Sequence, residues 1–456
     1  MGATRQAIDA WTMAEEPLAT QYLLANISPV GAAKGAVVAS PSTNSPNYFY
    51  HWVRDASMVS SAVVDLYQNA PNAVAKKTYG DILNDLIDFS RGLQALPPQG
   101  NIGGLGEPKY LVTGQLFTGS WGRPQNDGPA LRAMAFTRLA NLLLDEGQGD
   151  LVTQKLYRAE MPATTLIKED LEYVAHHWSD TCFDLWEENH GHHFFTQMVQ
   201  RKALLTGAAL ANRLNDSGAA NFYSQQAAAL ETALERYWSP TDNFVYVTLD
   251  EDGGISYKTS HLDSAVVLGA LWGDNADGVF TPDDPRILAT AARLEQTFSS
   301  LYSVNSTSSG APGILIGRYP EDRYDGYGTS SLGNGWPLIT AAYAELYERA
   351  ATRFEVAGVI PITSVSAPFF SRLGWSGRLG ATGKADIVAG TREFSHLIVA
   401  MRSKADDFLA RIEYDGQSSQ GHYSEEVNRS TGKQQGAIDL TWNYAAFLSA
   451  FKARVN

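Results

Sequence analysis

The segment Phe183–His190, with the sequence FDLWEENH, is the stretch around which the rest of the chain is interpreted. It places two adjacent carboxylates, Glu187 and Glu188, directly after Trp186. An indole ring offers a flat apolar face on which a sugar ring can rest while a carboxyl group reaches the sugar oxygens. Repulsion between the carboxylates and desolvation by the tryptophan both raise a carboxyl pKa, as a general acid for glycosidic cleavage requires. Taken alone, the segment fits a solvated acidic turn better, and the rest of the chain reverses that preference.

Length and composition indicate a globular protein with a sizeable core. The chain has 456 residues, of which 44% are hydrophobic, and a formal net charge of −14. Nucleic acids and anionic membrane surfaces attract basic faces, so this charge argues against both as partners, whereas a neutral polymer such as a glucan stays compatible. No run of 18 or more apolar residues occurs, so no membrane-spanning helix is expected.

The sequence predicts a mostly helical protein. Helical apolar spacing recurs in about twelve segments, and the best strand candidate, 243–248, suggests a small hairpin. Long polar loops at 97–126, 303–334 and 412–436 carry aromatic and charged residues, which favours a functional role. No low-complexity linker divides the chain, so one domain over 1–456 is expected. The predicted helices are 5–24, 53–70, 77–95, 127–146, 163–177, 193–214, 217–237, 260–272, 283–302, 335–354, 391–411 and 438–454.

Two motifs combine aromatic rings with charged groups close to predicted helix starts. The segment 48–55, YFYHWVRD, ends in Arg54 and Asp55, which could hold sugar hydroxyls or form a structural ion pair. The segment 119–127, GSWGRPQND, contains Trp121, which could line a cleft or pack inside its loop. Neither motif decides between its two interpretations by itself.

Two later loops have the same mixed character. The segment 317–324, GRYPEDRY, interleaves tyrosines with charges, and again either a cleft or loop packing explains it. The acidic residue Glu425 lies in a polar loop ahead of the segment 439–444, DLTWNY. By itself, Glu425 is more typical of a solvated surface acid.

Signals for other chemistries are weak. His190, His192 and His193 lack a matching carboxylate or cysteine cluster, so no metal site is expected. The single cysteine, Cys182, excludes an intrachain disulfide and is more typical of a packed core residue than of a nucleophile. The glycine-rich segment 103–106 lacks a preceding strand and a phosphate-binding lysine, and no Gly-x-Ser-x-Gly motif occurs. We therefore expect no cofactor.

Taken together, the motifs resemble the glucoamylases of glycoside hydrolase family 15. Six motifs arrive in the family's order and span most of the chain, which makes the set specific although each motif alone is weak. These motifs are Tyr48–Asp55, Leu105–Lys109, Gly119–Gln125, Asp184–Glu188, Arg318–Asp322 and Asp439–Trp442.

The resemblance implies an all-α fold, an (α/α)6 barrel of six inner and six outer helices with long active-site loops at one end. It also implies a glucan 1,4-α-glucosidase, an inverting and exo-acting enzyme that releases β-D-glucose from the non-reducing ends of starch and maltooligosaccharides. By motif, Glu187 takes the place of the general acid and Glu425 that of the general base. The residues implied in substrate binding are Tyr48, Trp52, Arg54, Asp55, Trp121, Leu185, Trp186, Glu188, Arg318, Tyr324 and Trp442.

Two departures from the family pattern bear on chain-length preference more than on the reaction. Glu426-Val427 stands where the family usually has Gln-Tyr, which adds an ionisable group beside the predicted base. The segment 333–337, GNGWP, replaces a Gly-Asn-Pro-Trp pattern. A related hydrolase of α-1,6-glucans or trehalose stays open. A non-catalytic carbohydrate-binding protein is a weaker alternative, because both acids are present.

The expected compartment and assembly also come from the resemblance. It implies a secreted or periplasmic protein, and a monomer is expected. The starch-binding domain found in many relatives has no counterpart in the sequence, so soluble maltooligosaccharides are expected to be better substrates than raw granules. The segment 1–5, MGATR, lacks the pattern of a signal peptide, so an intracellular location is not excluded.

Overall fold

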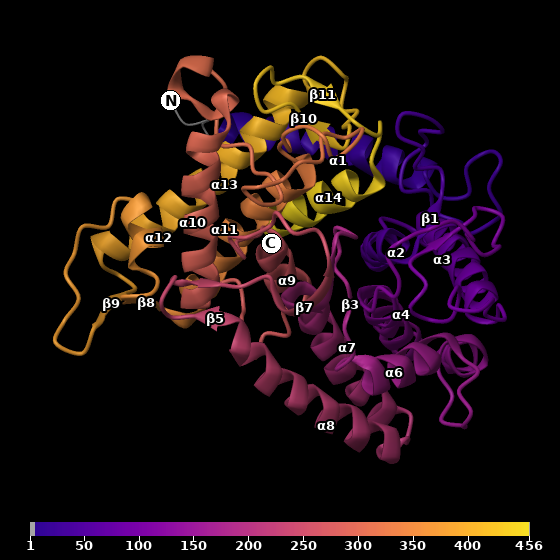
Figure 1. The fold of residues 1–456 in the computed structure, drawn as a ribbon. Coiled ribbons are helices and arrows are strands. Elements are labelled where there is room, and N and C mark those ends of the chain that lie inside the picture. Colours follow the sequence, from indigo (N-terminus) through magenta and orange to yellow (C-terminus); the bar gives the residue numbers. More distant parts are fainter. Residues whose placement is uncertain (1–4, 456) are drawn as a thin grey trace. The chain divides into compact units, whose positions relative to one another are not determined.

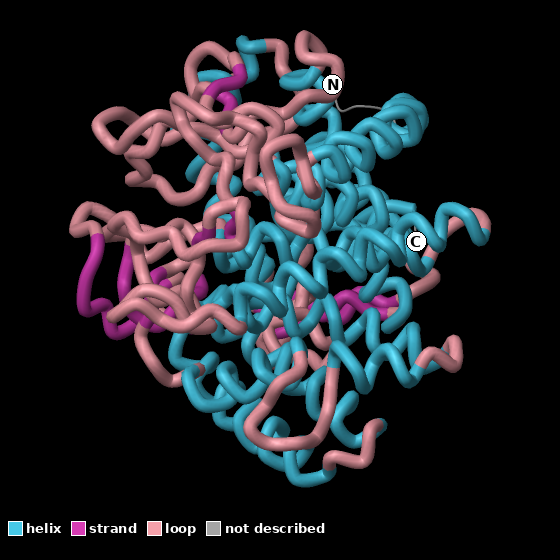
Figure 2. Tube along the Cα trace, turned by 90° about the vertical axis from the view of Figure 1, so that its right-hand side faces the viewer, coloured by secondary structure: helices cyan, strands magenta, loops and turns pink. Residues whose placement is uncertain are grey.

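The computed structural model describes residues 5–455, apart from the side chain of Thr307, and most of its regular structure is helical (Figure 2). Each of the twelve predicted helices is present, with ends that differ by a few residues. The predicted hairpin is also present, but shorter than expected. It pairs β5 (Trp238–Ser239) with β6 (Phe244–Val245). The mostly helical character predicted from the sequence is therefore confirmed.

Side-chain caps mark where several helices begin. Asp284 accepts a hydrogen bond from the backbone N–H of Arg286, and the adjacent Pro285 has the fixed φ that suits a first helical residue. Thr391 accepts in the same way from the N–H of Phe394. These polar residues satisfy backbone donors that have no partner inside the helix.

The chain forms two compact units, here called unit 1 and unit 2. Unit 1 comprises Met1–Tyr22, Arg236–Val247 and Ser256–Asn456. Unit 2 comprises Leu23–Glu235 and Thr248–Ile255. The α1 helix (Arg5–Ala25) runs without interruption from unit 1 into unit 2.

Six helices of unit 2 are labelled in Figure 1. Their side chains divide them into three helices that are buried on most of their faces and three that are buried on one side only. A helix that is buried around most of its circumference occupies a core layer, and one with a single buried stripe covers it. The inner helices α2, α4 and α7 pack in that order, and α3, α6 and α8 pack on them. Their bounds are α2 (Val53–Gln68), α3 (Ala73–Gln94), α4 (Asp127–Asp145), α6 (Leu166–His177), α7 (Phe194–Arg213) and α8 (Ser217–Leu234).

Unit 1 has the same plan of inner and outer helices. The α11 helix is buried on nearly every side and packs against α9, α13 and α14. The outer helix α10 packs on α9, and Trp11 of α1 meets Phe447 of α14 edge-to-face with ring centroids 5.4 Å apart. The bounds in this unit are α9 (Ala265–Trp272), α10 (Pro285–Leu301), α11 (Pro337–Ala357), α13 (Arg392–Gly416) and α14 (Thr441–Val455).

Small antiparallel sheets hold the loops that carry the predicted site residues. In unit 2, β1 (His51–Trp52) pairs with β2 (Lys109–Tyr110), and β4 (Asn189–His193) lies between β3 (Cys182–Phe183) and β7 (Thr248–Gly254). In unit 1, β10 (Glu426–Val427) pairs with β11 (Gln434–Gln435).

Some short elements were not predicted. They are the three-residue helix α5 (Gly149–Leu151), a π-helical turn at Val152–Leu156, α12 (Ala367–Arg372), and an antiparallel hairpin of β8 (Val359–Thr363) and β9 (Lys384–Val388). Within residues 5–455, no helix is both long and apolar enough to cross a lipid bilayer.

Candidate active site

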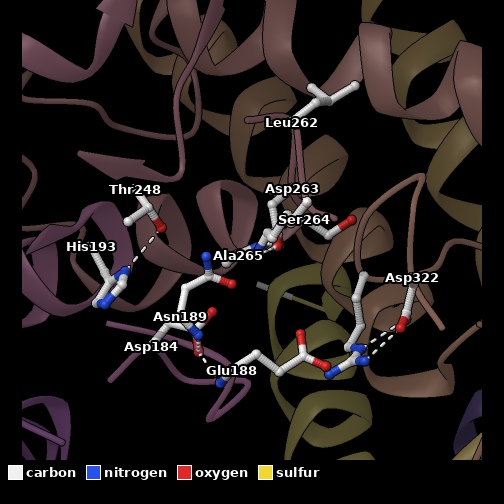
Figure 3. Close-up of polar contacts among 12 residues, drawn as sticks. Asp184, Glu188, Asn189, His193, Thr248, Leu262, Asp263, Ser264, Ala265 and Asp322 are labelled. Carbon is white, nitrogen blue, oxygen red and sulfur yellow. Dashed lines mark hydrogen bonds and ion pairs between the residues drawn. The ribbon is translucent and has the colours of Figure 1, made fainter. Parts of the chain in front are cut away.

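The predicted acid Glu187 lies in the tight turn that joins β3 to β4. Asp184 shapes this turn, because its Oδ1 atom accepts hydrogen bonds from the backbone N–H groups of Glu188 at 2.7 Å and Asn189 at 3.2 Å (Figure 3). Glu187 itself has a φ of +68°, in the left-handed region that side-chain-bearing residues rarely adopt. Such local strain persists only where the surrounding structure enforces it, and it is frequent at functional sites.

Arg54 anchors the Glu187 carboxylate. Its Nη2 donates to Glu187 Oε1 at 3.2 Å, while its Nη1 donates to Asp127 Oδ2 at 2.8 Å and to Gln125 Oε1 at 3.0 Å. The guanidinium is 4% exposed, so these contacts occur away from bulk solvent. Charge-assisted hydrogen bonds of this kind fix geometry as well as charge. Asp127, the first residue of α4, was not predicted as part of the site.

The environment of Glu187 suits a proton donor. Burial raises the pKa of its carboxyl group to about 7, against the opposing effect of Arg54. The negative charge of Asp55 raises this pKa further, and Lys109 lowers it. Burial likewise raises the pKa of Asp55 to about 6. The sequence interpretation assigned the role of charged neighbour to Glu188, whereas the larger electrostatic contributions come from Arg54, Asp55 and Lys109.

Lys109 is a second site residue that the sequence analysis did not single out. Pairing of β1 with β2 places it directly opposite Trp52. Burial lowers the pKa of its ammonium group to about 8. Attraction to the aromatic faces keeps a cation favourable there despite the loss of water. The ammonium nitrogen lies over the rings of Tyr50, Trp52, Phe117 and Trp121, at 4.1, 4.5, 4.3 and 3.5 Å from their centroids.

The other residues predicted for substrate binding in unit 2 lie on the same loops. Trp52 packs edge-to-face against Tyr48 and Trp121, with centroid distances of 5.6 and 5.9 Å. Leu185 and Trp186 are buried in the turn that carries Glu187, and Glu188 follows them with partial exposure. Unit 2 therefore brings the predicted acid Glu187 together with Arg54 and with an aromatic surface.

The histidines of β4 have local structural partners. His190 and His192 face Asp252 and Asp250 across the β4–β7 pair. His193 Nδ1 contacts the Thr248 hydroxyl at 2.9 Å (Figure 3). Within the described residues, no group of three or more histidine, cysteine, aspartate or glutamate side chains could hold a metal ion.

The predicted base Glu425 lies in unit 1, immediately before β10, with 1% of its surface exposed. Its Oε2 accepts hydrogen bonds from the Tyr324 hydroxyl at 3.0 Å and from the Ala437 N–H at 3.3 Å. Gly436, at a φ of +79°, leaves room for this carboxylate, because a Cβ atom there would lie 2.7 Å from Oε2. Glu425 and Tyr324, which were predicted from separate motifs, are thus joined by a hydrogen bond.

Arg318 and Trp442 complete the predicted set in unit 1. Arg318 forms a two-pronged ion pair with Asp322, at 2.8 Å from Nε and 2.6 Å from Nη2, and its guanidinium lies 5.3 Å from the Tyr324 ring centroid. Asp322 Oδ1 also accepts from the Tyr324 N–H at 2.9 Å, so the same carboxylate orients both residues. Trp442 is buried in the first turn of α14.

Comparison with known proteins was made by sequence and by structure. The sequence model of glycosyl hydrolases family 15 matches residues 17–452. Glucoamylase 1 of Rhizopus oryzae is 39% identical over 448 residues, covering 98% of this chain and 71% of that protein. A glucoamylase of Blastobotrys adeninivorans is 42% identical over 445 residues, covering 96% and 70%.

Solved structures agree with these sequence matches. The family 15 glucoamylase of Hypocrea jecorina matches with a TM-score of 0.86 and 31% identity, covering 98% of this chain and 72% of the other. The glucoamylase of Saccharomycopsis fibuligera matches with the same TM-score and identity, covering 100% and 96%. This similarity confirms the predicted (α/α)6-barrel fold class.

Proposed function

The chain belongs to the glycosyl hydrolases of family 15, and we propose that it releases β-D-glucose from the non-reducing ends of α-1,4-glucans by an inverting, single displacement. The family and its glucoamylase members make the chain an exo-acting, glucose-releasing enzyme, a glucan 1,4-α-glucosidase that acts on starch. The stereochemical course and the residues that carry the reaction are the finer part of the proposal.

The observation that carries the assignment of the acid is the environment of Glu187. A buried carboxyl group with a pKa of about 7 still holds its proton in weakly acidic solution. Efficient general acids have a pKa near the pH at which they work. Arg54 holds the same group in place at 3.2 Å, so the proton is presented from a defined position. Strongly perturbed pKa values of this kind cluster at functional sites.

In the proposed reaction, the Glu187 carboxyl group transfers its proton to the glycosidic oxygen as the bond from this oxygen to C1 breaks. A water molecule attacks C1 from the opposite face of the ring and gives its proton to the Glu425 carboxylate. This course requires the two carboxyl groups to be about 6.5–9.5 Å apart, which leaves room for the water. The buried carboxylate of Glu425 receives two hydrogen bonds on Oε2, which supports its role as the ionised partner.

The proposed substrate contacts divide by chemistry. Arg54, Asp55, Glu188 and Arg318 offer charged hydrogen-bonding groups to sugar hydroxyls, and the aromatic rings offer stacking faces. The proposed aromatic and apolar contacts are Tyr48, Trp52, Trp121, Leu185, Trp186, Tyr324 and Trp442.

Replacement of each acid by its amide tests these roles. In Glu187→Gln and Glu425→Gln we expect kcat on maltooligosaccharides to fall by about 10²–10⁴-fold, which is the usual contribution of a general acid or base. Calorimetric titration should show that Glu187→Gln still binds maltose. Glu393 is an exposed glutamate on α13, so Glu393→Gln is a charge-matched control that should keep the wild-type kcat. Near-normal turnover in either acid variant would contradict its assignment.

A further inference from the structure

Glu426, the neighbour of the proposed base, is a buried acid that forms no ion pair with any residue that the structure describes. Its exposed surface is 0%. The Oε2 atom accepts a hydrogen bond from Asn334 Nδ2 at 2.8 Å, and Oε1 is buried with no hydrogen-bond partner in the described part of the chain. The fully buried carboxyl group of Glu426 thus has the neutral amide of Asn334 as its hydrogen-bond partner.

The orientation of the Asn334 amide is fixed by its other contacts. Its Oδ1 accepts from the backbone N–H of Arg429 at 3.0 Å, so the NH₂ group must be the end that faces Glu426. The backbone carbonyl oxygen of Asn334 accepts a separate hydrogen bond from the Tyr302 hydroxyl at 2.9 Å. Glu426 Oε2 is therefore an acceptor, and Oε1 is the oxygen that is left to carry a proton.

The cations near Glu426 are engaged with other groups. Arg318 forms its two-pronged ion pair with Asp322, and the Arg429 guanidinium donates to the carbonyl oxygens of Gly333 and Leu301. The titratable and charged groups that face Glu426 are Glu425 before its strand, Arg318 and Asp322 from the loop that precedes α11, Tyr302 at the end of α10, and Arg429 after β10.

An ionised Glu426 would be strongly unfavourable in this position. A buried carboxylate without a paired cation loses its hydration and gains no interaction of equal strength in return. The adjacent Glu425 adds repulsion between like charges, and two carboxyl groups in one site resist ionising together. Burial, followed by the charge of Glu425, holds the pKa of Glu426 well above its ordinary value, although Asn334 and Arg318 oppose this shift.

We propose that Glu426 is a neutral, proton-holding positioning residue, so that the Glu425–Glu426 pair carries a single negative charge and the folded state loses stability as the pH rises. The inference rests on the proposed function only where it assigns that single charge to the general base. A neutral carboxylic acid has nearly the shape of glutamine, so the site tolerates it as long as the proton stays. Where the family usually has glutamine, Glu426 therefore fits the site only while it is protonated, which acidic conditions favour.

The variant Glu426→Gln tests the proposal, because it keeps the shape of the neutral acid and cannot ionise. A group whose pKa is higher in the folded than in the unfolded state contributes stability below the unfolded pKa, and this contribution is lost as the pH rises towards the folded pKa. The folding equilibrium constant of the wild type should therefore fall, relative to that of the variant, by up to about tenfold per pH unit above pH 4.5, the ordinary pKa of a glutamate. The control Glu393→Gln should show no such trend.

Two further readouts complete the experiment. The infrared difference spectrum between wild type and Glu426→Gln at pH 5 should contain the carbonyl band of a protonated carboxyl group, and its absence would overturn the proposal. The acidic limb of kcat/KM should keep its midpoint in Glu426→Gln. A shift of about one unit to lower pH would show that Glu426 is charged beside Glu425 and would also overturn it.

These readouts separate the proposal from the assignment of Glu425. The stability difference and the infrared band report on Glu426 whether or not Glu425 is the base. If Glu425→Gln stays active while both readouts behave as expected, the assignment of the base fails and the neutral acid stands. If the stability difference does not change with pH, the neutral acid fails whatever Glu425 does.

Discussion

At the scale of single residues, the proton affinity of Glu187 is a balance among charges that do not themselves react. Burial favours the neutral acid and Asp55 adds to this preference, while Arg54 and Lys109 favour the carboxylate. The net result is a pKa of about 7 for a group whose ordinary value is 4.5. The acid form is lost as the pH rises through this value, so the proposed activity should decline above about pH 7.

The negative charge of Asp55 and the positive charge of Lys109 act on the pKa of Glu187 in opposite directions. Removing one or the other should therefore shift the alkaline limit of activity in opposite directions. Asp55→Asn removes a negative charge, so the pKa of Glu187 falls and the alkaline limb of kcat/KM shifts down by about one pH unit. Lys109→Met removes a positive charge, so the limb shifts up. The pH profile of each variant on maltotriose measures the midpoint.

A control keeps this comparison specific. Lys77 on α3 is exposed and pairs with Asp81, so Lys77→Met removes the same charge away from the site and should leave the limb in place. Shifts of Asp55→Asn and Lys109→Met in the same direction would contradict the electrostatic account of the acid.

At the scale of elements, short strand pairs position the site. The β3–β4 turn holds Glu187 in a left-handed conformation, and the β1–β2 pair sets Lys109 opposite Trp52. In unit 1, Gly335 pairs with Val427, so the strand that follows Glu425 is hydrogen-bonded to the chain ahead of α11. Gly335 is required there, because a Cβ atom would lie 2.1 Å from the side chain of Leu315.

The two glycines on either side of β11 form a matched pair. Gly436 and Gly432 both have positive φ, +79° and +70°, so alanine should strain the backbone by about 1–2 kcal/mol at each position. At Gly436 the added Cβ would also meet the Glu425 carboxylate, whereas at Gly432 the nearest side-chain atom is 3.9 Å away, on Val304. Gly436→Ala should therefore lose at least tenfold more kcat than Gly432→Ala, at similar stability in urea. An equal loss of kcat in both would show that the contact with Glu425 has no catalytic consequence.

The elements themselves were predictable where the hydrophobic pattern is long. Each of the twelve expected helices is present. They could be predicted because their apolar positions repeat over several turns. The six-residue helix α12 and the β8–β9 hairpin escaped prediction, because elements this short contain too few repeats to show a period. Motif matching singled out Glu187, Arg54 and Glu425 as candidate site residues, but it did not predict the groups that surround them in the structure.

Those surroundings depend on tertiary contacts that no local pattern contains. Lys109 belongs to a recognised motif, yet its four aromatic neighbours come together only through strand pairing and loop packing. Asp127 ends the segment 119–127, and its contact with Arg54 from the first residue of α4 depends on how α2 and α4 pack. Glu426 was noted as a substitution, but its burial and its one amide partner follow from the path of the chain near Asn334.

At the scale of the whole molecule, the chain passes between the two units several times. The boundaries fall after Tyr22, Glu235, Val247 and Ile255, and the first of them lies within the continuous helix α1. Separate domains are usually joined through exposed linkers that few contacts cross. Unit 1 also needs segments from both ends of the sequence. The expectation of a single domain stays a prediction, as do secretion and the monomeric state.

Calorimetry tests the single-domain prediction. If the units fold together, heating the whole chain should give one transition, with a calorimetric enthalpy equal to the van't Hoff enthalpy. Independent units should give two transitions, or a van't Hoff enthalpy well below the calorimetric one. Because the continuous helix α1 crosses the boundary after Tyr22, we expect the single transition.

In the proposed mechanism, Glu187 and Glu425 act together on opposite faces of one sugar ring. The configuration of the first product reports on this directly, because a single displacement by water inverts C1 whereas a covalent intermediate retains its configuration. Proton NMR of a maltooligosaccharide digest, recorded before mutarotation, should show β-D-glucose as the first anomer formed. Initial release of α-D-glucose would contradict the account.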